Sequence, residues 1–403
     1  HMRRYAYGGD PVLLLPGETD KDSLKVDYFN PNAGIHFYST RLDSSKLYYD
    51  IGLDYNLLYQ SKVYYQHMAA MDVDLGYDMD IFYARLNMAY KMITMPNVED
   101  KIRHLVNLNP SISKRNNNWN FWLGLKLIAD ARYFNYPSAP VEYKTKLFFY
   151  PDLKLQFSII PTILSMHVGL DGEYKNNNAS EIIYINPFVI TQNMNGIIEP
   201  SDDMYTILPT DTKLRVKGGL TGHASVNTSY SLNVSYSMFE DMVFYINDQL
   251  EGRGFLPIYD DGELFNLKAA LTTRINKELS LSTEAGYYNY RMESVEKPWH
   301  KPSWDAKMIF NYNLRDKIIA SADIYALSKR YARFGPMSYT SSTSYEIFEM
   351  PLYVSLSLGI EYRYTKILSF WTRLNNIATD RYYEWNFYPS QRFLFMAGFT
   401  YSL

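Results

Sequence analysis

Apolar residues fall on every second position through most of this chain. The clearest case runs from Leu352 to Tyr364, where the positions in between carry mostly serine, glycine, glutamate and arginine. An alternation of period two places one set of side chains on each face of a β-strand, so this segment is predicted to be a strand with one dry and one wet face. Similar alternations begin near Leu47, Ala69, Phe121, Tyr230, Trp304 and Phe393. The chain is therefore predicted to be all-β.

The dry stretches have the length and the ends of membrane-spanning strands. Each covers about 9–11 residues, which is enough to cross a bilayer as a tilted strand. Many end in an aromatic residue, and the chain holds 39 Tyr, 21 Phe and 6 Trp. Because aromatic rings favour the boundary between lipid and water, these ends predict girdles at the membrane surfaces.

Short and long connections alternate between the predicted strands. The short ones lie at 225–227, 276–277, 315–316 and 365–366, and the long ones at 176–211, 247–262, 291–303, 328–349 and 378–390. Short turns at one membrane face and long loops at the other are typical of bacterial outer-membrane barrels, in which the turns are periplasmic. A soluble β-sandwich also alternates, but it does not explain the long strands or the alternating connection lengths.

We therefore predict a transmembrane antiparallel up-and-down β-barrel of about 16 strands, with a range of 14–18. The barrel is expected over residues 41–403, beginning near Lys46. Its last strand, at 391–403, is expected to pair with a first strand near 46–57, because an open sheet edge in lipid leaves backbone groups unpaired.

Two parts of the chain alternate less clearly. Residues 1–40 contain Pro11, Pro16 and Pro31 and are expected to form a lead segment in the periplasm or the lumen rather than a strand. The stretches 102–113, 143–158 and 181–192 are ambiguous, and the last fits a loop element as well as a strand.

Composition narrows the function classes. Lys and Arg number 40 against 43 Asp and Glu, for a net charge of −3, and this lack of a basic excess argues against nucleic acid as a partner. The absence of cysteine excludes disulfides, cysteine-ligated zinc and a thiol nucleophile. The longest apolar run near the start, residues 12–15, is far shorter than the ~20 residues of a spanning helix. We expect a mature or truncated form from which an export signal has been removed, with removal of an N-terminal domain as a further alternative.

The C-terminal part carries a distinctive set of motifs. They are Leu358–Arg363, a tight turn, Leu368–Asn376, Tyr382-Tyr383, Tyr388-Pro389 and the final strand Phe393–Leu403. Over about residues 310–403 this pattern resembles the C-terminal barrel of TonB-dependent receptors. The resemblance implies an outer-membrane location and a role in solute transport.

The same resemblance bears on whether transport uses energy supplied through TonB. Members of that family have about 22 strands and a plug domain in the lumen, with a segment that binds TonB. No plug-like mixture of helix and strand precedes the predicted barrel, so we expect the protein to work without TonB energy. Leu403 stands where such barrels usually end in Phe.

Charged residues on the wet strand faces are the candidate functional residues. They carry both signs and form no ladder of one sign, so a hydrated, salt-bridged lumen is favoured over a selectivity lining. The candidate lumen-lining residues are Asp50, Asp54, Asp72, Asp74, Arg85, Lys126, Asp130, Arg215, Lys217, Lys268, Glu284, Asp305, Lys307, Asp323, Glu361, Arg363 and Arg373.

Neither catalysis nor a bound group is predicted. His167 shares a strand face with Ser165 and Asp171, but residues two steps apart on a strand lie about 7 Å from each other, too far for a catalytic relay. The acidic stretches at 199–203 and 259–263 lack the spacing of a calcium loop and are interpreted as solvated charge. The protein is expected to be a non-enzyme with no cofactor and no metal.

The predicted partners follow from the barrel surface. The outer face should contact outer-membrane lipid and lipopolysaccharide, and the long loops are suited to other envelope proteins. The candidate signal for the barrel-assembly machinery comprises Phe393, Phe395, Phe399, Tyr401 and Leu403.

Two functions remain open on the sequence alone. The chain is either a solute transporter or channel, or a non-transporting scaffold or anchor in an outer-membrane complex for assembly, secretion or surface lipoproteins. Lumen occupancy distinguishes them: if residues 1–40 or 176–211 fold inward and close the bore, a passive channel is disfavoured.

Overall fold

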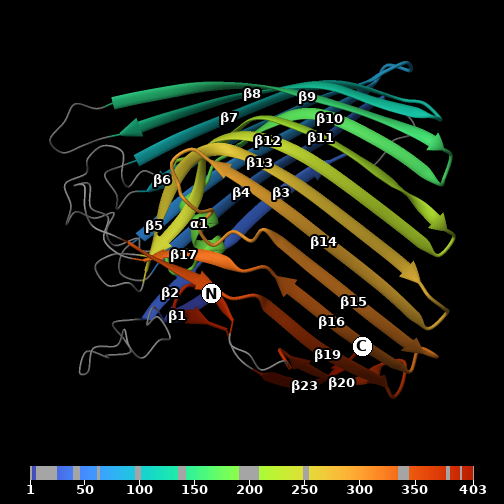
Figure 1. The fold of residues 1–403 in the computed structure, drawn as a ribbon. Coiled ribbons are helices and arrows are strands. Elements are labelled where there is room, and N and C mark those ends of the chain that lie inside the picture. The colour runs from blue at the N-terminus through green and yellow to red at the C-terminus, as the bar shows by residue number, and fades with distance from the viewer. Residues whose placement is uncertain are drawn as a thin grey trace, which may run out of the picture.

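The alternating segments form the strands of one antiparallel sheet. In the computed structural model this sheet has nineteen strands and curls into a barrel-shaped wall (Figure 1). The structure describes residues 2–5, 25–39, 46–60, 64–95, 101–134, 142–189, 208–247, 254–334, 345–377, 382–390 and 393–402. The predicted all-β, up-and-down architecture is confirmed.

The elements follow one another around the wall. The first part of the sheet contains β1 (Met2–Tyr5), β2 (Lys25–Phe29), β3 (Asn32–Tyr38), β4 (Leu47–Gln60), β5 (Tyr64–Asp78), β6 (Tyr83–Met95), β7 (Lys101–Arg115), β8 (Trp119–Phe134), β9 (Glu142–Ile160) and β10 (Leu164–Lys175). After the helix α1 (Ala179–Ile185) come β11 (Thr210–Ser225), β12 (Thr228–Asn247), β13 (Phe255–Arg274), β14 (Leu279–Met292), β15 (Trp304–Leu314), β16 (Ile318–Leu327), β19 (Tyr353–Arg363), β20 (Leu368–Asn375) and β23 (Leu394–Tyr401). Two hairpins lie in loops: β17 (Arg330–Phe334) with β18 (Glu346–Met350), and β21 (Tyr383–Trp385) with β22 (Tyr388–Pro389).

Short turns gather at one end of the wall, and the strand ends from which the long connections leave lie at the other (Figure 1). The four predicted short turns are confirmed, because each joins two neighbouring paired strands. We call this end the turn end and the opposite one the loop end. The predicted long connection at 247–262 is shorter than expected, since β12 runs to Asn247 and β13 begins at Phe255. Both strands continue there because their side chains are buried rather than solvated.

The N-terminal region differs from the sequence-based expectation. Residues 25–38, expected to belong to a lead segment, instead form β2 and β3, and both strands pair with β4. Pro31 is tolerated between them because they lie at the sheet edge, where a missing N–H costs little. Without the four-residue β1 and the five-residue β2 the sheet has seventeen strands, within the expected range.

The predicted closing pair is also wrong. One edge of β4 is taken by β3 and the other by β5, so β4 has no edge left for the last strand. β23 pairs with β20, and within the described residues no strand pairs with its other edge. The error follows from reading β3 as part of a lead segment.

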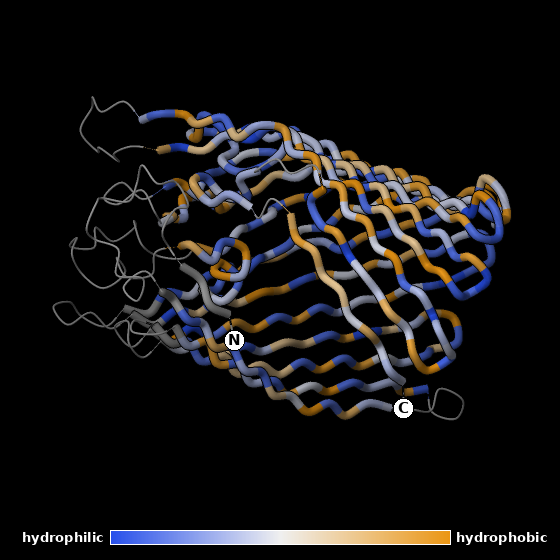
Figure 2. The backbone as a smooth tube through the Cα atoms, turned by 90° about the horizontal axis from the view of Figure 1, so that it is seen from below, coloured by the Kyte–Doolittle hydropathy of each residue, from blue (hydrophilic) through white to orange (hydrophobic). Residues whose placement is uncertain are grey.

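The three ambiguous stretches have different outcomes. β7 and β9 occupy the first two, and the described part of the third, 181–189, holds most of α1 and is a loop element. On the outer face the apolar positions of the strands are exposed in the isolated chain, for example Leu358 at 40%, Ile360 at 50% and Tyr362 at 45%. Figure 2 shows this alternation as a change of colour from residue to residue along the strands. Among the described residues, helices long and apolar enough to span a bilayer are absent.

Candidate functional site

A short segment after β10 leaves the wall and lies on its concave side (Figure 1). We call residues 176–189, which include α1, the strap. The helix begins at Asn178, whose side-chain oxygen accepts from the Glu181 N–H at 2.8 Å, while Glu181 accepts from the Asn178 amide at 3.2 Å. The first of these bonds satisfies one of the backbone donors that a helix start leaves free, and the second joins the two side chains. At the other end the Asn186 N–H donates to Ile182 O at 2.8 Å, and the helix stops.

Three hydrogen bonds attach the strap to the part of the wall formed by early strands. Tyr28 of β2 donates its hydroxyl to Pro187 O at 3.1 Å. Gln66 of β5 donates to the Ser180 hydroxyl at 3.3 Å, and Arg103 of β7 donates to Asn176 O at 3.2 Å. Each bond comes from a different strand, so this attachment is spread along the strap.

An aromatic cluster attaches the strap to the part of the wall formed by later strands. Phe188 stacks on Tyr388 with ring centroids 3.6 Å apart, and Phe188 O accepts from the Phe255 N–H at 3.0 Å. Val189 forms an isolated parallel bridge with Phe255. The buried members of this cluster are Ile182, Val189, Val243, Tyr245, Phe255, Trp385 and Tyr388.

The two attachments place the strap across the bore at the loop end. β2 and β13 are far apart in the strand order, and α1 lies between the opposing walls in Figure 1. The described part of the 176–211 connection therefore folds inward, the arrangement that disfavours a freely open channel.

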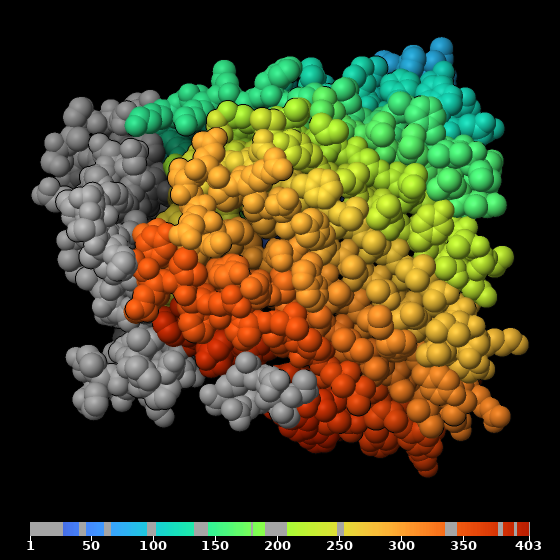
Figure 3. Space-filling view, viewed as in Figure 1, coloured from blue at the N-terminus to red at the C-terminus, as the bar shows by residue number. Residues whose placement is uncertain are grey.

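The wall beneath this cluster is covered on both sides. Phe244, Ile246 and Trp299 form a second cluster on the opposite face of β12, with Tyr331 and Tyr345 packed against it. Figure 3 shows this part of the wall covered by side chains of the loop-end segments, in orange. Arg330 donates to the backbone carbonyls of Glu384, at 2.9 Å, and Tyr383, which attaches the β21–β22 hairpin to the same region.

His300 follows Trp299 of the second cluster in the chain and contacts the aromatic cluster. Its Nδ1 lies 3.0 Å from Tyr245 O, so that nitrogen carries the proton, and its ring contacts Phe255 and Trp385 at centroid distances of 5.4 and 5.0 Å. Burial among these rings lowers the pKa of His300 to about 3, because the charged imidazolium loses its hydration there. Next to it, burial lowers the pKa of Lys301 to about 8.

Solved structures share this architecture at very low sequence identity. The copper transporter OprC superposes with a TM-score of 0.69 at 10% identity, with 93% of this chain and 65% of that chain covered. The ferric-catecholate import receptor Fiu from E. coli K12 gives 0.68 at 7% identity, covering 94% and 64%. The pyoverdine receptor FpvA from Pseudomonas aeruginosa PAO1 gives 0.67 at 10%, covering 94% and 62%.

The chain has the barrel fold of TonB-dependent receptors. It spans slightly less than two thirds of the length of these receptor chains. No protein-family model and no curated protein matches the sequence. The resemblance inferred over residues 310–403 is thus confirmed at the level of the fold.

A buried ion cluster lies in the receptor-type barrel next to the strap. Asp130 is 1% exposed and accepts from Arg103 at 2.7 and 2.8 Å and from Arg132 at 2.8 Å. Arg103 also donates to the Tyr174 hydroxyl at 2.6 Å. Since Arg103 also binds Asn176 O, the strap is tied to this cluster. Asp130 was a predicted lumen residue, whereas Arg103 lies in the ambiguous stretch 102–113.

Most other predicted lumen-lining residues are brought together in pairs. Asp74 pairs with Arg85 and Asp323 with Arg373, at 2.7 and 3.0 Å, and Glu361 lies 3.2 Å from Arg363. The remaining contacts are Arg215 and Lys217 with Asp171, Lys126 with Gly172 O, Lys268 over the Tyr288 ring, Asp305 with Tyr288, His36 near Asp50 and Asp54, and Lys307 opposite Glu284. Asp72 lies opposite Gly52 on β4 and Ala89 on β6. Mixed pairing of this kind fits a salt-bridged interior better than a selectivity ladder.

The other candidates are placed without forming a site. Phe395, Phe399 and Tyr401 are exposed along β23, Phe393 is exposed just before it, and Leu403 lies outside the described residues. The hydroxyl of Ser165 lies 3.5 Å from that of Ser158. Asp171 forms ion pairs with Arg215 and Lys217. Across the described ranges, no group of acidic or histidine side chains has the arrangement of a metal site.

The strap lies within the 176–211 connection, whose inward folding is one of the alternatives considered above, but its helix was not predicted. A usable signal was present in the Asn-x-x-Glu spacing of Asn178 and Glu181, which marks a helix start of the capping-box type. That spacing predicts the helix but not where it docks.

Proposed function

We propose that this chain is an integral outer-membrane transporter in which the strap controls passage through the bore. The observation that supports this proposal best is the attachment of the strap to opposing parts of the wall. The fold is shared with proteins named as a copper transporter, a ferric-catecholate import receptor and a pyoverdine receptor. Transport of a small solute is the role that this fold and an obstructed bore jointly favour.

The two attachments differ in strength, and this difference sets how the strap moves. Among the described residues, the early-strand side has the three hydrogen bonds above, each contributing about 0.5–1.5 kcal/mol net, and Ile183 of the strap is buried outside the late-strand cluster. The late-strand side buries Ile182, Val189 and the stacked Phe188, at about 1.5–3 kcal/mol per apolar side chain and a further 0.5–1.5 kcal/mol for the ring pair. The strap therefore detaches first from β2, β5 and β7 and stays docked on β12 and β13.

Conductance in planar bilayers tests this gate. Because the chain contains no cysteine, Gln66→Cys and Ser180→Cys together introduce the only two thiols. Joining them with a short bifunctional thiol reagent holds the weaker side shut and should abolish the current carried by the untreated double variant. Ser180→Cys alone, treated in the same way, is the matched control and should keep its current.

The outcomes separate the two functions left open by the sequence. Current that rises in Tyr28→Phe, which loosens the early-strand side, and is abolished by the crosslink supports a gated transporter. Current that is unchanged by both modifications shows that the strap is not the gate. No current in any variant, including one with the strap loosened, favours the non-transporting scaffold.

A further inference from the structure

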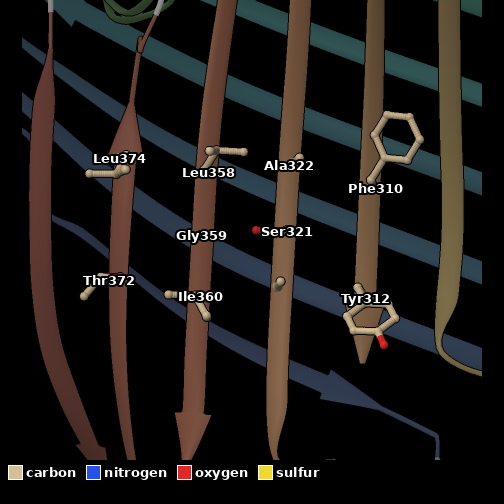
Figure 4. A pocket seen from close by; sticks show the side chains of 10 residues that line it. Phe310, Tyr312, Ser321, Ala322, Leu358, Gly359, Ile360, Thr372 and Leu374 are labelled. Carbon is tan, nitrogen blue, oxygen red and sulfur yellow. The ribbon is translucent and has the colours of Figure 1, made fainter. Parts of the chain in front are cut away.

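Two apolar grooves run along the outer face of the wall. The wide groove crosses β4 to β9 and has a volume of about 650 Å³; its apolar lining comprises Leu47, Leu75, Tyr77, Ala84, Leu86, Pro110, Ile112, Leu123, Leu125, Pro151 and Leu153. The narrow groove crosses β15 to β20 and has a volume of about 420 Å³ (Figure 4). Both lie on the face that a bilayer would cover.

The wide groove has a structural cause. The pairing of β7 with β8 passes from Leu108–Leu127 to Ser111–Gly124 and skips the positions between, because Pro110 has no N–H to donate. Pro110 and the neighbouring Ala84 project little from the wall, whereas Tyr77 and Leu123 remain 45% and 49% exposed at its sides. A second in-strand proline, Pro151, lines the same groove.

A lysine lies just beyond the wide groove, on the side of the turn end. Lys114 is two residues beyond Ile112 on β7 and therefore faces the same side. Its Nζ lies 5.4 Å from the centre of the Phe82 ring, and no described carboxylate pairs with it. Lys46, also near this end, is neutralised by Asp80 at 2.7 Å.

Aromatic rings mark the level of Lys114 as the membrane boundary. Phe82 packs on Phe121 with centroids 6.1 Å apart, and Phe121 stacks on Trp119 at 5.8 Å. Aromatic side chains at a strand end favour the headgroup region, where a lysine extends its charge out of the apolar layer. An unpaired cation at this depth meets lipid phosphates.

We propose that the wide groove binds a glycerophospholipid of the leaflet at the turn end. One acyl chain lies in the groove, and the phosphate pairs with the ammonium group of Lys114. The assignment combines an apolar surface of the right placement with a cation complementary to the phosphate charge. It requires the barrel to lie in a membrane but does not depend on the strap acting as a gate.

The narrow groove provides an internal control. Ala320 and Ala322 form its floor, between Phe310 and Tyr312 on one side and Leu358 and Ile360 on the other (Figure 4). Toward the turn end the next outward positions are Leu314, Ile318 and Tyr362, none of which is charged. This groove has the apolar surface without the cation, so it should not retain a phospholipid.

Native mass spectrometry of the detergent-purified full chain with added phosphatidylglycerol tests the proposal. The wild type should retain one lipid, and Lys114→Gln should retain it about tenfold less well, the size of one charge-assisted contact. Ala84→Phe fills the wide groove and should abolish retention, whereas Ala322→Phe fills the narrow groove and should leave it unchanged. A difference in gel mobility between unheated and heated samples verifies that each variant is folded.

Three results would overturn the proposal. Equal retention in all four proteins means non-specific annular lipid. Retention that falls with Ala84→Phe but not with Lys114→Gln means an apolar occupant without phosphate recognition. A dimer mass that Ala84→Phe abolishes means that a second copy of the chain covers the groove.

Discussion

We call the part of a strand whose apolar face is expected to meet lipid, such as residues 353–363 of β19, the membrane band. This band of β19 and the loop-end part of β12 are both extended, yet their apolar side chains differ in exposure. In β19, Val354 and Leu358 are 44% and 40% exposed on one face. In β12, Val243 and Phe244 point to opposite faces and are 6% and 0% exposed. The membrane band needs lipid to cover its apolar face, whereas the loop end supplies its own cover from the strap and the loops. Strict alternation therefore marks the band, and its loss marks the place where the protein packs on itself.

The largest effect that sharpens this contrast is expected at Phe255. Its side chain is fully buried between the strap and the β21–β22 hairpin, so Phe255→Ala leaves a cavity and should destabilise the loop-end cluster by about 3–5 kcal/mol. The unfolding midpoint of the Trp fluorescence measures this, because Trp385 belongs to the same cluster. Phe399→Ala, at a position 70% exposed on β23, is the matched control and should shift the midpoint much less, since lipid can fill the space. Equal shifts would erase the distinction between the two regions.

A charge placed in the membrane band is the next largest test. Leu356→Lys should destabilise the barrel by about 2–4 kcal/mol if the residue lies near the midplane, because the charge enters lipid. Ser357→Lys should be tolerated, since Ser357 lies opposite Asp323 on β16 and its replacement would face an acidic neighbour. Refolding titrations in lipid vesicles compare the two, and equal sensitivity would reverse the assigned facing.

Acid should affect the loop end before the band. Because the pKa of His300 is about 3 in the folded state and about 6.5 when exposed, the opened state binds the proton first as the pH falls. Stability is therefore present at pH 7 and is lost below pH 6.5, by about 2–3 kcal/mol at pH 4.5. Lys301, with a pKa of about 8, stays charged over this range. His300→Gln should flatten the dependence of the Trp midpoint on pH, and an unchanged slope would assign it to other groups.

The membrane band could be predicted from the sequence because each strand there separates lipid from lumen. β7 and β9 were ambiguous for a physical reason: Leu105 and Tyr150 are buried in a cluster with Ile128, with Phe148 packed against it. Apolar residues on both faces erase the period of two. β3 was misread because an edge strand tolerates Pro31.

The strap could not be placed from the sequence because its contacts are distant along the chain. Tyr28 and Pro187 are separated by 159 positions, and Gln66 and Ser180 by 114. Local spacing predicts a helix cap, but no local pattern specifies partners so far away. The lumen facing of the charged residues and the expectation that transport needs no TonB energy stay predictions.

The smallest expected effect tests the order in which the strap detaches. Tyr28→Phe removes the hydroxyl that donates to Pro187 O and should weaken the early-strand attachment by about 0.5–1.5 kcal/mol. That change raises the population of detached straps about two- to tenfold. The rate at which a thiol reagent modifies Ser180→Cys reports this population, and it should rise by the same factor. Tyr184→Phe is the matched control, because Tyr184 is 88% exposed and should leave the rate unchanged.

A second reporter on the strap decides whether it hinges or leaves as one unit. Val189→Cys lies on the side held by Phe255 and the aromatic cluster, which Tyr28→Phe does not touch. If the strap pivots on β12 and β13, the modification rate at position 189 should stay constant while the rate at position 180 rises. A rise of equal size at both positions would mean that the strap undocks as a whole. The three hydrogen bonds and the aromatic cluster would then break cooperatively, and the unequal strengths assigned to the two attachments would be wrong.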